Sequence, residues 1–376
     1  METAADLQNT SELSQDLFEI LGTHHLQFYV GNARQSAYYY RRAFGFELIG
    51  YEGPETGNPE TASYVLKQNK IVFVLTSPIL STHPINDFIV KHGDGVRDIA
   101  LSVGNADEAY KIATQNGAEG VTEPYTRTDK FGSVRVATVK TYGDTVHTFV
   151  QNIDYTGVFL PGFAATPKDP LAKPVGLLHV DHIVGNMGWN QMEDTVNYYK
   201  RVFGFSKFVS FDDKDISTEY SSLKSTVVAN QNKWIKFPIN EPAQGIKKSQ
   251  IEEYIKFNNG PGVQHIAMES ANIIETITAL KANGVEFIST PESYYVTLAE
   301  RVGTIDEDFK AIQNLSILVD RDDKGYMLQL FTRPQQDRPT LFIEIIQRKG
   351  GESFGKGNFK ALFEAIEREQ ELRGNL

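Results

Sequence analysis

An internal repeat restricts the fold of this chain more than any other feature of its sequence. The segment HHLQFYVGNARQSAYYYRRAFGFELIGY begins at residue 24, and HVDHIVGNMGWNQMEDTVNYYKRVFGFSKFVSF begins at residue 179. Both segments show an apolar strand, a Gly-Asn break, an amphipathic helix, an FGF turn and a second strand. Matching Gly31 to Gly185 gives an offset of 154, which becomes 159 at the FGF turn because the second copy has five extra residues. We infer a duplication with one insertion.

A second pair of segments follows the same plan. GDGVRDIALSV and ADEAYKIATQNGAEGV match GPGVQHIAMES and IIETITALKANGVEF, and β-type runs follow each, ending in GDTVHTFVQ and GYMLQLFTR. The sequence therefore predicts an α+β protein of four βαβββ modules, two in each half. The Pro-rich stretch 161–176 predicts a linker. We expect an N-terminal arm at 1–20, one domain at 21–160 and a second, catalytic domain at 177–376.

Composition excludes several classes of protein. A chain of 376 residues is long for a single hydrophobic core. A net charge of −11 without a basic run argues against a nucleic-acid partner. The chain contains no cysteine, so any metal site must use histidines and carboxylates. The sequence shows neither a signal peptide nor an apolar run of about 20 residues, so we expect a cytoplasmic protein that does not enter membranes.

The two halves differ at three positions where the second half carries a side chain of metal-ligand type. Superposing the halves by sequence gives the pairs His182 with Phe28, His265 with Asp98, and Glu344 with Pro161. The last pair requires one gap and the matching of Phe159 to Phe342.

These three residues lie in strands whose neighbours are apolar. Alternation in TLFIEII places Phe342, Glu344 and Ile346 on one face. A carboxylate buried there is costly unless it is paired or binds a metal. A lone histidine in an apolar strand is usually a core residue, but two histidines with one carboxylate form the facial triad that suits non-heme Fe(II). We therefore predict that His182, His265 and Glu344 bind Fe(II).

The segment GGESFGKG, residues 350–357, matches GxxxxGK of a phosphate loop. Such a loop needs Ser or Thr at the next position, where this chain has Gly357. The alternative is a glycine hinge before a helix for which we expect Asn358 to be the N-cap. The apolar residues of that helix recur at helical spacing, at Phe359, Leu362, Phe363 and Ile366. The helix either closes a pocket or simply packs on its domain.

The motifs LHVDHIVGN, FPINEP, KKSQIEEY, GPGVQHIAM, DRDDKGYMLQLFTRP, FIEIIQR and FGKGNFKALFEAIEREQ together resemble the 4-hydroxyphenylpyruvate dioxygenase family of the vicinal oxygen chelate superfamily. The resemblance covers essentially the whole chain after the N-terminal arm and is most specific in the second half. It implies that each pair of modules forms an open mixed-sheet barrel and that a C-terminal helix closes the second barrel.

The resemblance also implies roles for residues around the metal. Ser225, Asn240 and Gln250 match polar residues near the phenol of the substrate, and Gln264 and Gln329 match polar residues near the iron. The aromatic walls would be Phe331, Phe342 and Phe359, and the lid and its hinge would contain Phe354, Gly355, Gly357, Asn358, Leu362 and Phe363.

The activity that the resemblance implies is the conversion of 4-hydroxyphenylpyruvate and O₂ to homogentisate and CO₂ in tyrosine catabolism. The iron performs the chemistry, so no side chain is expected to act as a general acid or base. We also expect a homo-oligomer. One alternative is 4-hydroxymandelate synthase, whose members tend to carry a smaller aliphatic residue at the position of Phe331. An extradiol ring-cleaving dioxygenase and a non-enzymatic binding protein of the same fold are further alternatives.

Overall fold

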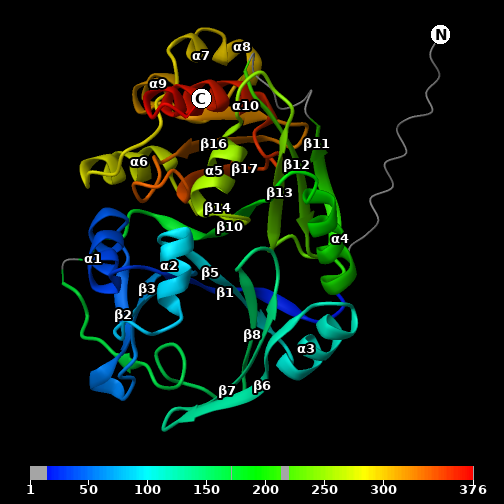
Figure 1. Ribbon diagram of the computed structural model, residues 1–376. Helices are drawn as coiled ribbons and strands as arrows, with labels where there is room; N and C mark the ends of the chain where they lie inside the picture. The colour runs from blue at the N-terminus through cyan, green and yellow to red at the C-terminus, as the bar shows by residue number, and fades with distance from the viewer. Residues whose placement is uncertain (1–14, 171, 213–219, 376) are drawn as a thin grey trace.

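The structure is a computed structural model that describes residues 15–170, 172–212 and 220–375. Figure 1 shows the two halves of the chain stacked, with the first half in blue and cyan below and most of the second half in green to red above. Each half is built on one mixed β-sheet with helices on its outer side. The predicted α+β architecture is therefore confirmed.

The first sheet has nine strands in the order β6-β7-β8-β5-β1-β4-β3-β2-β9. β1 pairs with β4 and β5 pairs with β8 in parallel, whereas β1 and β5, at the centre, are antiparallel. The strands are β1 (Ile20–Tyr29), β2 (Glu47–Glu52), β3 (Thr61–Gln68), β4 (Ile71–Pro78), β5 (Gly95–Val103), β6 (Gly120–Asp129), β7 (Gly132–Lys140), β8 (Val146–Asn152) and β9 (Ala164–Ala165). The helices are α1 (Ala33–Ala43), η1 (Pro54–Thr56), α2 (Ile85–His92) and α3 (Ala106–Gln115).

The second sheet has eight strands in the order β11-β12-β13-β10-β14-β17-β16-β15, with the same central antiparallel pair and flanking parallel pairs. The strands are β10 (Leu177–Asn186), β11 (Ser206–Phe211), β12 (Ser222–Ala229), β13 (Lys236–Ala243), β14 (Gly262–Ser270), β15 (Leu318–Arg321), β16 (Tyr326–Phe331) and β17 (Phe342–Lys349). The helices are α4 (Met192–Phe203), α5 (Gln250–Asn258), α6 (Ile273–Ala282), α7 (Ser293–Val296), α8 (Leu298–Val302), α9 (Phe309–Leu315), η2 (Lys356–Asn358) and α10 (Phe359–Leu372). Two βαβββ modules in each half are confirmed, and α7 to α9 are an insertion in the last one.

Some of the predicted domain limits fall on undescribed parts of the chain. Residues 1–14 of the predicted arm and residue 171 of the predicted linker lie outside the described residues. Within the linker, β9 pairs with β2 and so extends the first sheet. The limits at residues 160 and 177 stay a prediction.

Three of the four module helices begin in the same way. Asn32, Asn105 and Asn272 each accept a hydrogen bond from the backbone N–H three residues later, which caps the start of a helix. α4 instead begins after Gln191 without a side-chain cap, and Asn186 is the last residue of β10. The Gly-Asn pairs of the two halves therefore have different structural roles.

This difference makes part of the sequence superposition wrong. In the sheets, His182 pairs with Ala267 as His25 pairs with Ala100, and Val184 pairs with His265 as Gln27 pairs with Asp98. The residue corresponding to His182 is therefore His25, three positions from Phe28, whereas the pair His265 and Asp98 is confirmed. A strand register is set by pairing with distant residues, so a local Gly-Asn match could not fix it.

The predicted counterpart of Glu344 is also wrong. Glu344 pairs with Ala267 in β14, and the matching register in β5 and β8 puts Thr148 at this position, not Pro161. The strand that corresponds to β8 is thus β17, and GDTVHTFVQ does not match GYMLQLFTR. The insertion of α7 to α9 before β15 shifts the last strands along the sequence and produced the false match.

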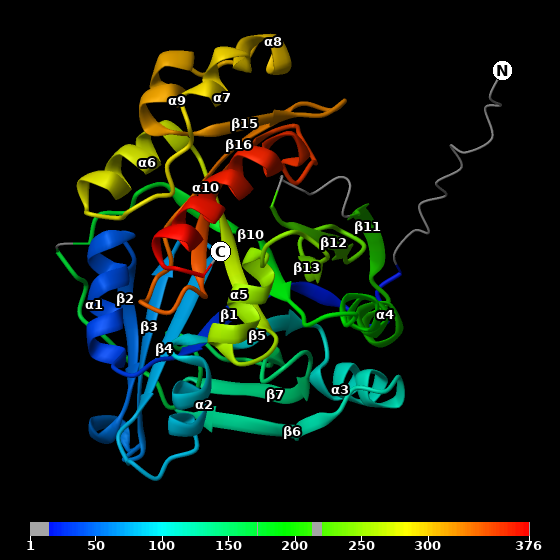
Figure 2. The same cartoon turned by 45° about the horizontal axis from the view of Figure 1, so that its top comes forward.

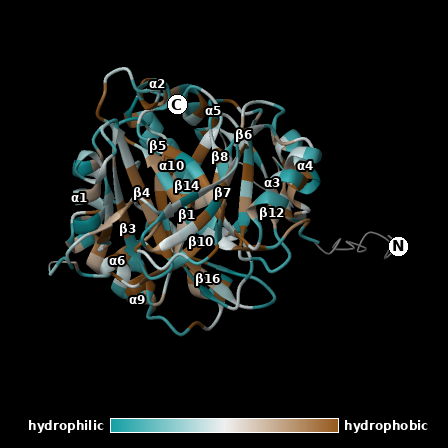
Figure 3. Cartoon of the chain, turned by 90° about the horizontal axis from the view of Figure 1, so that it is seen from below, coloured by the Kyte–Doolittle hydropathy of each residue, from teal (hydrophilic) through white to brown (hydrophobic). Residues whose placement is uncertain are grey.

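The apolar residues of both sheets form a shared core. Figure 3 shows hydrophobic residues on the strands and hydrophilic residues over the outward surfaces of the helices. Tyr199 of α4 is fully buried where the halves meet, and its hydroxyl lies 2.9 Å from Nε2 of His147 in β8. α10 crosses the second half as a red helix in Figure 2. In the described part of the chain, no helix is long and apolar enough to cross a membrane.

Candidate metal centre

Three neighbouring strands of the second sheet bring His182, His265 and Glu344 together. β10 carries His182, β14 carries His265 and β17 carries Glu344. Oε2 of Glu344 lies 3.2 Å from Nε2 of His182 and 3.3 Å from Nε2 of His265. Their potential ligand atoms all lie within 4.8 Å of one another. Rigid strands therefore place the three side chains as a preformed group of ligand type.

The surroundings of Glu344 fit a bound cation. Its side chain is 2% exposed, and its Oε1 has no hydrogen-bond partner among the described residues. Burial acts to raise the pKa of Glu344, but the charges and hydrogen bonds of His182 and His265 outweigh it and lower the pKa to about 2. A buried, ionised carboxylate with one unpaired oxygen is costly without a further positive partner. Two imidazoles and this carboxylate are the donor set of a non-heme iron site.

Hydrogen bonds to the Nδ1 atoms of His182 and His265 orient both imidazoles. Nδ1 of His182 lies 2.7 Å from Oδ1 of Asp181, and Nδ1 of His265 lies 3.0 Å from Oε1 of Gln264. Both partners are acceptors, so each Nδ1 carries a proton, and each Nε2, which faces Oε2 of Glu344, is the atom that a cation would bind. Burial lowers the pKa of His265, which favours its neutral form. Burial acts in the same direction on His182, but the charges of Glu344 and Asp181 and the hydrogen bonds to them outweigh it and raise the pKa of this imidazole. A bound cation would replace the proton that Nε2 of His182 shares with Glu344, because a histidine binds a metal in its neutral form.

A cavity of about 80 Å³ opens beside these three residues. All eight residues predicted to bind substrate line it, together with Phe354, Leu362 and Phe363 of the predicted lid. Gln264 donates from Nε2 to Oε1 of Gln250 over 3.4 Å, and Asn240 donates to Oδ1 of Asn186 over 3.2 Å. The ring of Phe342 stacks on His265 with centroids 4.8 Å apart. The cavity thus has polar groups fixed between aromatic walls.

Five further residues line the cavity that the sequence analysis did not assign to it. They are Val184, Phe211, Leu223, Val227 and Pro238. The alternation of β12, in which Leu223, Ser225 and Val227 share one face, contains the signal for two of them. Phe211 carries no comparable signal, because its contact with Phe359 joins β11 to α10.

The loop before α10 does not have the free amides of a phosphate loop, and its role as a hinge stays a prediction. Oδ2 of Asp322 accepts the backbone N–H groups of Glu352 and Ser353 at 2.7 and 2.8 Å. The carboxylate of Asp322 thus already accepts hydrogen bonds from backbone N–H groups that a bound phosphate would need. Gly355 has a φ of +80°, and a Cβ there would lie 2.3 Å from Nε2 of Gln329. This glycine is therefore required both by the turn and by its close approach to the cavity wall.

The side chain of Asn358 does not cap α10, in contrast to our expectation. Asn358 stands at the N-cap position without a side-chain cap hydrogen bond, and its Oδ1 accepts from the hydroxyl of Tyr294 at 2.6 Å. It is fully buried and does not line the cavity. A Cβ on Gly357 would lie 2.4 Å from Oδ1 of Asp320. Tyr294 and Asp320, which our sequence analysis left out, thus help to fix the start of α10.

The corresponding face of the first sheet is filled by the protein itself. Tyr155, Leu160 and Phe163 pack there in a buried apolar cluster, and Phe159 contacts His25 with ring centroids 5.0 Å apart. Oδ1 of Asp98 accepts the backbone N–H of Thr148 at 3.0 Å. Within residues 15–170, no group of three potential metal-ligating side chains was found. The segment 155–163 thus occupies the place that the cavity has in the second half.

Comparisons with known proteins agree with this geometry. The sequence model of the Glyoxalase/Bleomycin resistance protein/Dioxygenase superfamily matches residues 22–139 and 179–330. The chain is 48% identical to a 4-hydroxyphenylpyruvate dioxygenase of Yarrowia lipolytica, over 100% of this chain and 98% of that protein. It is 50% identical to a 4-hydroxyphenylpyruvate dioxygenase of Danio rerio, over 95% of this chain and 93% of that protein.

A solved structure shares both the fold and the arrangement of the two halves. A triple mutant of 4-hydroxymandelate synthase from Streptomyces coelicolor superposes with a TM-score of 0.83 and 28% sequence identity. The match covers 94% of this chain and 99% of that protein. The predicted open-barrel fold is therefore confirmed.

Proposed function

Because the chain belongs to the 4-hydroxyphenylpyruvate dioxygenase family of the glyoxalase/bleomycin resistance protein/dioxygenase superfamily, we propose that it converts 4-hydroxyphenylpyruvate and O₂ to homogentisate and CO₂. The observation that carries this proposal is the buried Glu344, which has one oxygen between two imidazoles and the other without a hydrogen-bond partner in the described part of the chain. We propose that His182, His265 and Glu344 hold Fe(II). The reaction belongs to tyrosine catabolism.

Three protein ligands leave part of the coordination shell of an iron ion open. When bound, Fe(II) supplies the Lewis acidity that holds a 2-oxo acid and the reducing power that activates O₂. The protein carries a net charge of −11, so local attraction at this centre is needed to hold an anionic substrate.

The side chains of the cavity bind and orient the substrate. The ring of 4-hydroxyphenylpyruvate fits between Phe331, Phe342 and Phe359, because aromatic rings offer large apolar faces to one another. Ser225, Asn240 and Gln250 also line the cavity and offer donors and acceptors to the phenol. These contacts fix which ring carbon faces the reaction centre, and orientation of this kind accelerates a reaction strongly.

Gln264 and Gln329 have a different task in this proposal. Gln264 lies against both His265 and Gln250 through hydrogen bonds of 3.0 and 3.4 Å. It thus holds a metal ligand and a substrate contact in one network. The side-chain amide of Gln329 lies against Gly355, directly before α10, and so helps to position the start of this helix.

α10 excludes water from the cavity. Phe359, Leu362 and Phe363 close the cavity from the side of this helix. Its far end is tied to α5 because Arg373 donates to Glu253 at 2.8 and 3.2 Å. Exclusion of water protects reactive intermediates from side reactions. No side chain acts as a general acid or base in this proposal.

4-Hydroxymandelate synthase is the second candidate, because a structure of that enzyme superposes on the whole chain. The ring of Phe331 favours ring hydroxylation. It lies edge-on to His265 and to Phe342, with both pairs of centroids 6.1 Å apart. In this position it restricts the space next to the metal ligands on the side-chain end of the substrate.

Product analysis tests the proposal. Protein loaded anaerobically with Fe(II) receives 4-hydroxyphenylpyruvate and then O₂, and the products are identified by mass spectrometry, with chelator-treated protein as the control. Homogentisate with release of CO₂ is the expected result. 4-Hydroxymandelate would move the assignment to the second candidate, and the absence of an oxygen-dependent product despite bound iron would refute the substrate. The cytoplasmic location and the homo-oligomeric state stay predictions from the sequence.

A further inference from the structure

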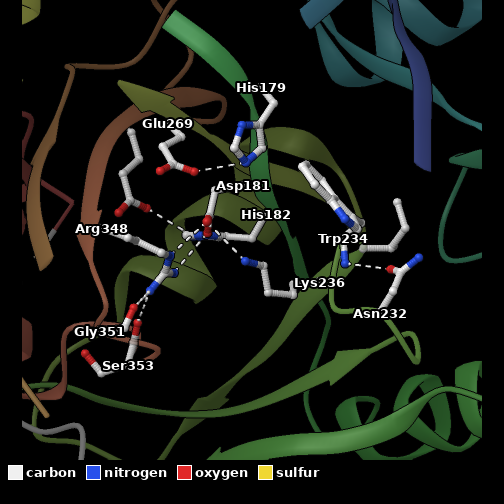
Figure 4. A network of polar contacts seen from close by, with 12 residues as sticks. His179, Asp181, His182, Asn232, Trp234, Lys236, Glu269, Arg348, Gly351 and Ser353 are labelled. Atoms are coloured by element: carbon white, nitrogen blue, oxygen red, sulfur yellow. Dashed lines mark hydrogen bonds and ion pairs between the residues drawn. The ribbon is translucent and has the colours of Figure 1, made fainter. Parts of the chain in front are cut away.

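A network of polar side chains lies behind His182, on the side away from Glu344. Figure 4 shows Asp181 at its centre, with Lys236 and Arg348 pointing toward the carboxylate. Asp181 is 3% exposed and is the residue directly before His182 in β10. The network therefore lies inside the protein and touches a proposed metal ligand.

Both oxygens of Asp181 have two hydrogen-bond donors. Oδ1 faces Nδ1 of His182 at 2.7 Å and Nη2 of Arg348 at 2.9 Å. Oδ2 accepts from Nε of Arg348 at 2.8 Å and from Nζ of Lys236 at 3.1 Å. The guanidinium thus binds the carboxylate with two parallel hydrogen bonds, a geometry that fixes its orientation. A carboxylate held in this way can hold an imidazole in one rotamer and one tautomer.

The same region contains a second group of potential metal-ligating residues, His179, Asp181 and Glu269. A cation does not fit there, because Lys236 and Arg348 already form ion pairs with the carboxylate of Asp181. His179 and Glu269 form a separate pair, with Nε2 and Oε2 2.9 Å apart, and Trp234 packs against His179. Regular strand alternation would place His179 and His182, three residues apart, on opposite faces of the sheet. β10 has a register shift between Val180 and His182, so this rule does not apply here. We interpret this group as a charge network.

Arg348 also reaches the loop that leads to α10. Its Nη1 donates to the backbone oxygens of Gly351 and Ser353 at 3.1 and 2.8 Å, and its guanidinium lies 5.4 Å from the ring of Phe354. Phe354 in turn packs edge-on against His182, with centroids 5.2 Å apart. The guanidinium of Arg348 therefore contacts two groups that pack against His182, the carboxylate of Asp181 and the ring of Phe354.

We propose that Asp181 is a positioning residue that holds His182 as a metal ligand, and that Arg348 fixes this carboxylate and couples it to the hinge of α10. The proposal rests on the proposed function, because it takes His182 to be a metal ligand. It concerns residues that do not touch the substrate cavity, since neither Asp181 nor Arg348 lines it.

The physical effect acts through the imidazole. An acceptor on Nδ1 keeps the proton there, leaves Nε2 free and increases the basicity of the ring toward a cation. Loss of such a partner typically weakens metal binding by about 10- to 100-fold. The negative charge of Asp181 also lies close to the metal centre, so its removal acts in the same direction.

The decisive experiment compares metal binding by the full-length protein and by Asp181→Asn. The dissociation constant for Co(II), used as an air-stable probe, is measured by competition with a chelator. We expect an increase of about 10- to 100-fold for Asp181→Asn. Glu269→Gln is the matched control, because it neutralises a neighbouring carboxylate that does not contact His182, and we expect less than about a twofold change.

A spectroscopic measurement separates positioning from a loss of structure. In Zn(II)-loaded protein labelled with ¹⁵N-histidine, the native chain should show one strongly downfield Nδ1 proton from His182. In Asp181→Asn this signal should shift upfield or broaden by solvent exchange, while the signals of the other histidines stay in place. Arg348→Lys provides a second variant that keeps the charge and loses the paired hydrogen bonds, and its affinity should lie between those of the native protein and Asp181→Asn.

Each outcome decides one question. If the native protein binds Co(II) and Asp181→Asn and Arg348→Lys bind it equally well, the positioning proposal is refuted while the proposed function stands. If the native protein itself binds no Co(II), the proposed function fails. If Glu269→Gln weakens binding as much as Asp181→Asn, the effect is general to the charge network and the specific role of Asp181 is wrong.

Discussion

Replacing Asp98 by asparagine should stabilise the protein at neutral pH and have little effect in acid. Asp98 stands in the first sheet where His265 stands in the second, and its side chain is 5% exposed. Burial raises the pKa of Asp98 to about 6, against the hydrogen bonds from Thr148. The folded state therefore binds the proton more tightly than the unfolded state, in which an aspartate titrates near about 4.

The sign and size of the effect follow from linkage. A raised folded pKa contributes stability that is fully present below about pH 4 and is lost as the pH rises through about 6. The shift of about two units corresponds to roughly 3 kcal/mol of free energy of unfolding, lost above about pH 7. Asparagine has no charge and keeps an oxygen to accept the N–H of Thr148, which Asp98 accepts at 3.0 Å. Asp98→Asn should therefore exceed the wild type by up to about 3 kcal/mol at neutral pH.

Urea unfolding of the two proteins at several pH values measures this difference. We expect the gap to grow by on the order of 1 kcal/mol between about pH 5 and about pH 7 and then to level off. Asp323→Asn, an exposed change in a turn, is the control and should leave the pH dependence of stability unchanged. A gap that is the same at all pH values, or one that favours the aspartate at neutral pH, would refute the reasoning.

Three further predictions concern the site. Glu344→Gln keeps the size of the side chain but removes its charge, so bound iron measured by elemental analysis should fall from about one per chain to near zero, and normal iron content would contradict the triad. Phe331→Ile should raise the ratio of 4-hydroxymandelate to homogentisate by about tenfold in mass spectrometry, and an unchanged ratio would show that this wall does not steer the product. Gly355→Ala should lower the free energy of unfolding by about 1 to 3 kcal/mol and slow turnover, because its Cβ meets Gln329. Gly284→Ala, which also has a positive φ but open space, should cost less, and equal losses would argue against the contact with Gln329.

The repeat in the sequence was sufficient to predict the modules and to select the three residues that the structure brings together as a candidate metal centre. Local periodicity reports strands and helices directly, because it follows from their geometry. A carboxylate inside the apolar run of β17 was a strong signal, since such a residue needs a partner of opposite charge. Glu344, His182 and His265 were therefore proposed as ligands before the fold was known, and the structure brings them together, although the positions matched to His182 and Glu344 were wrong.

The cavity itself depends on contacts that the sequence does not contain. Phe211 and Phe359 meet because α10 folds back onto β11 from a distant part of the chain. The segment 155–163 covers the first sheet through contacts of the same kind, between distant parts of the chain, and no periodicity in its sequence predicts them. Such contacts are set by the way in which complete elements pack, so they appear only with the tertiary structure.

The sequence by itself determined the duplicated modules, the three candidate ligands and the family, because each depends on short motifs and their spacing along the chain. The tertiary structure decided that His182 corresponds to His25, that Asp181 rests between Lys236 and Arg348, and which of the two barrels keeps an open cavity. The physical reason is that register, charge pairing and cavity closure are interactions between residues far apart in the chain, and their free energies exist only once the sheets have formed.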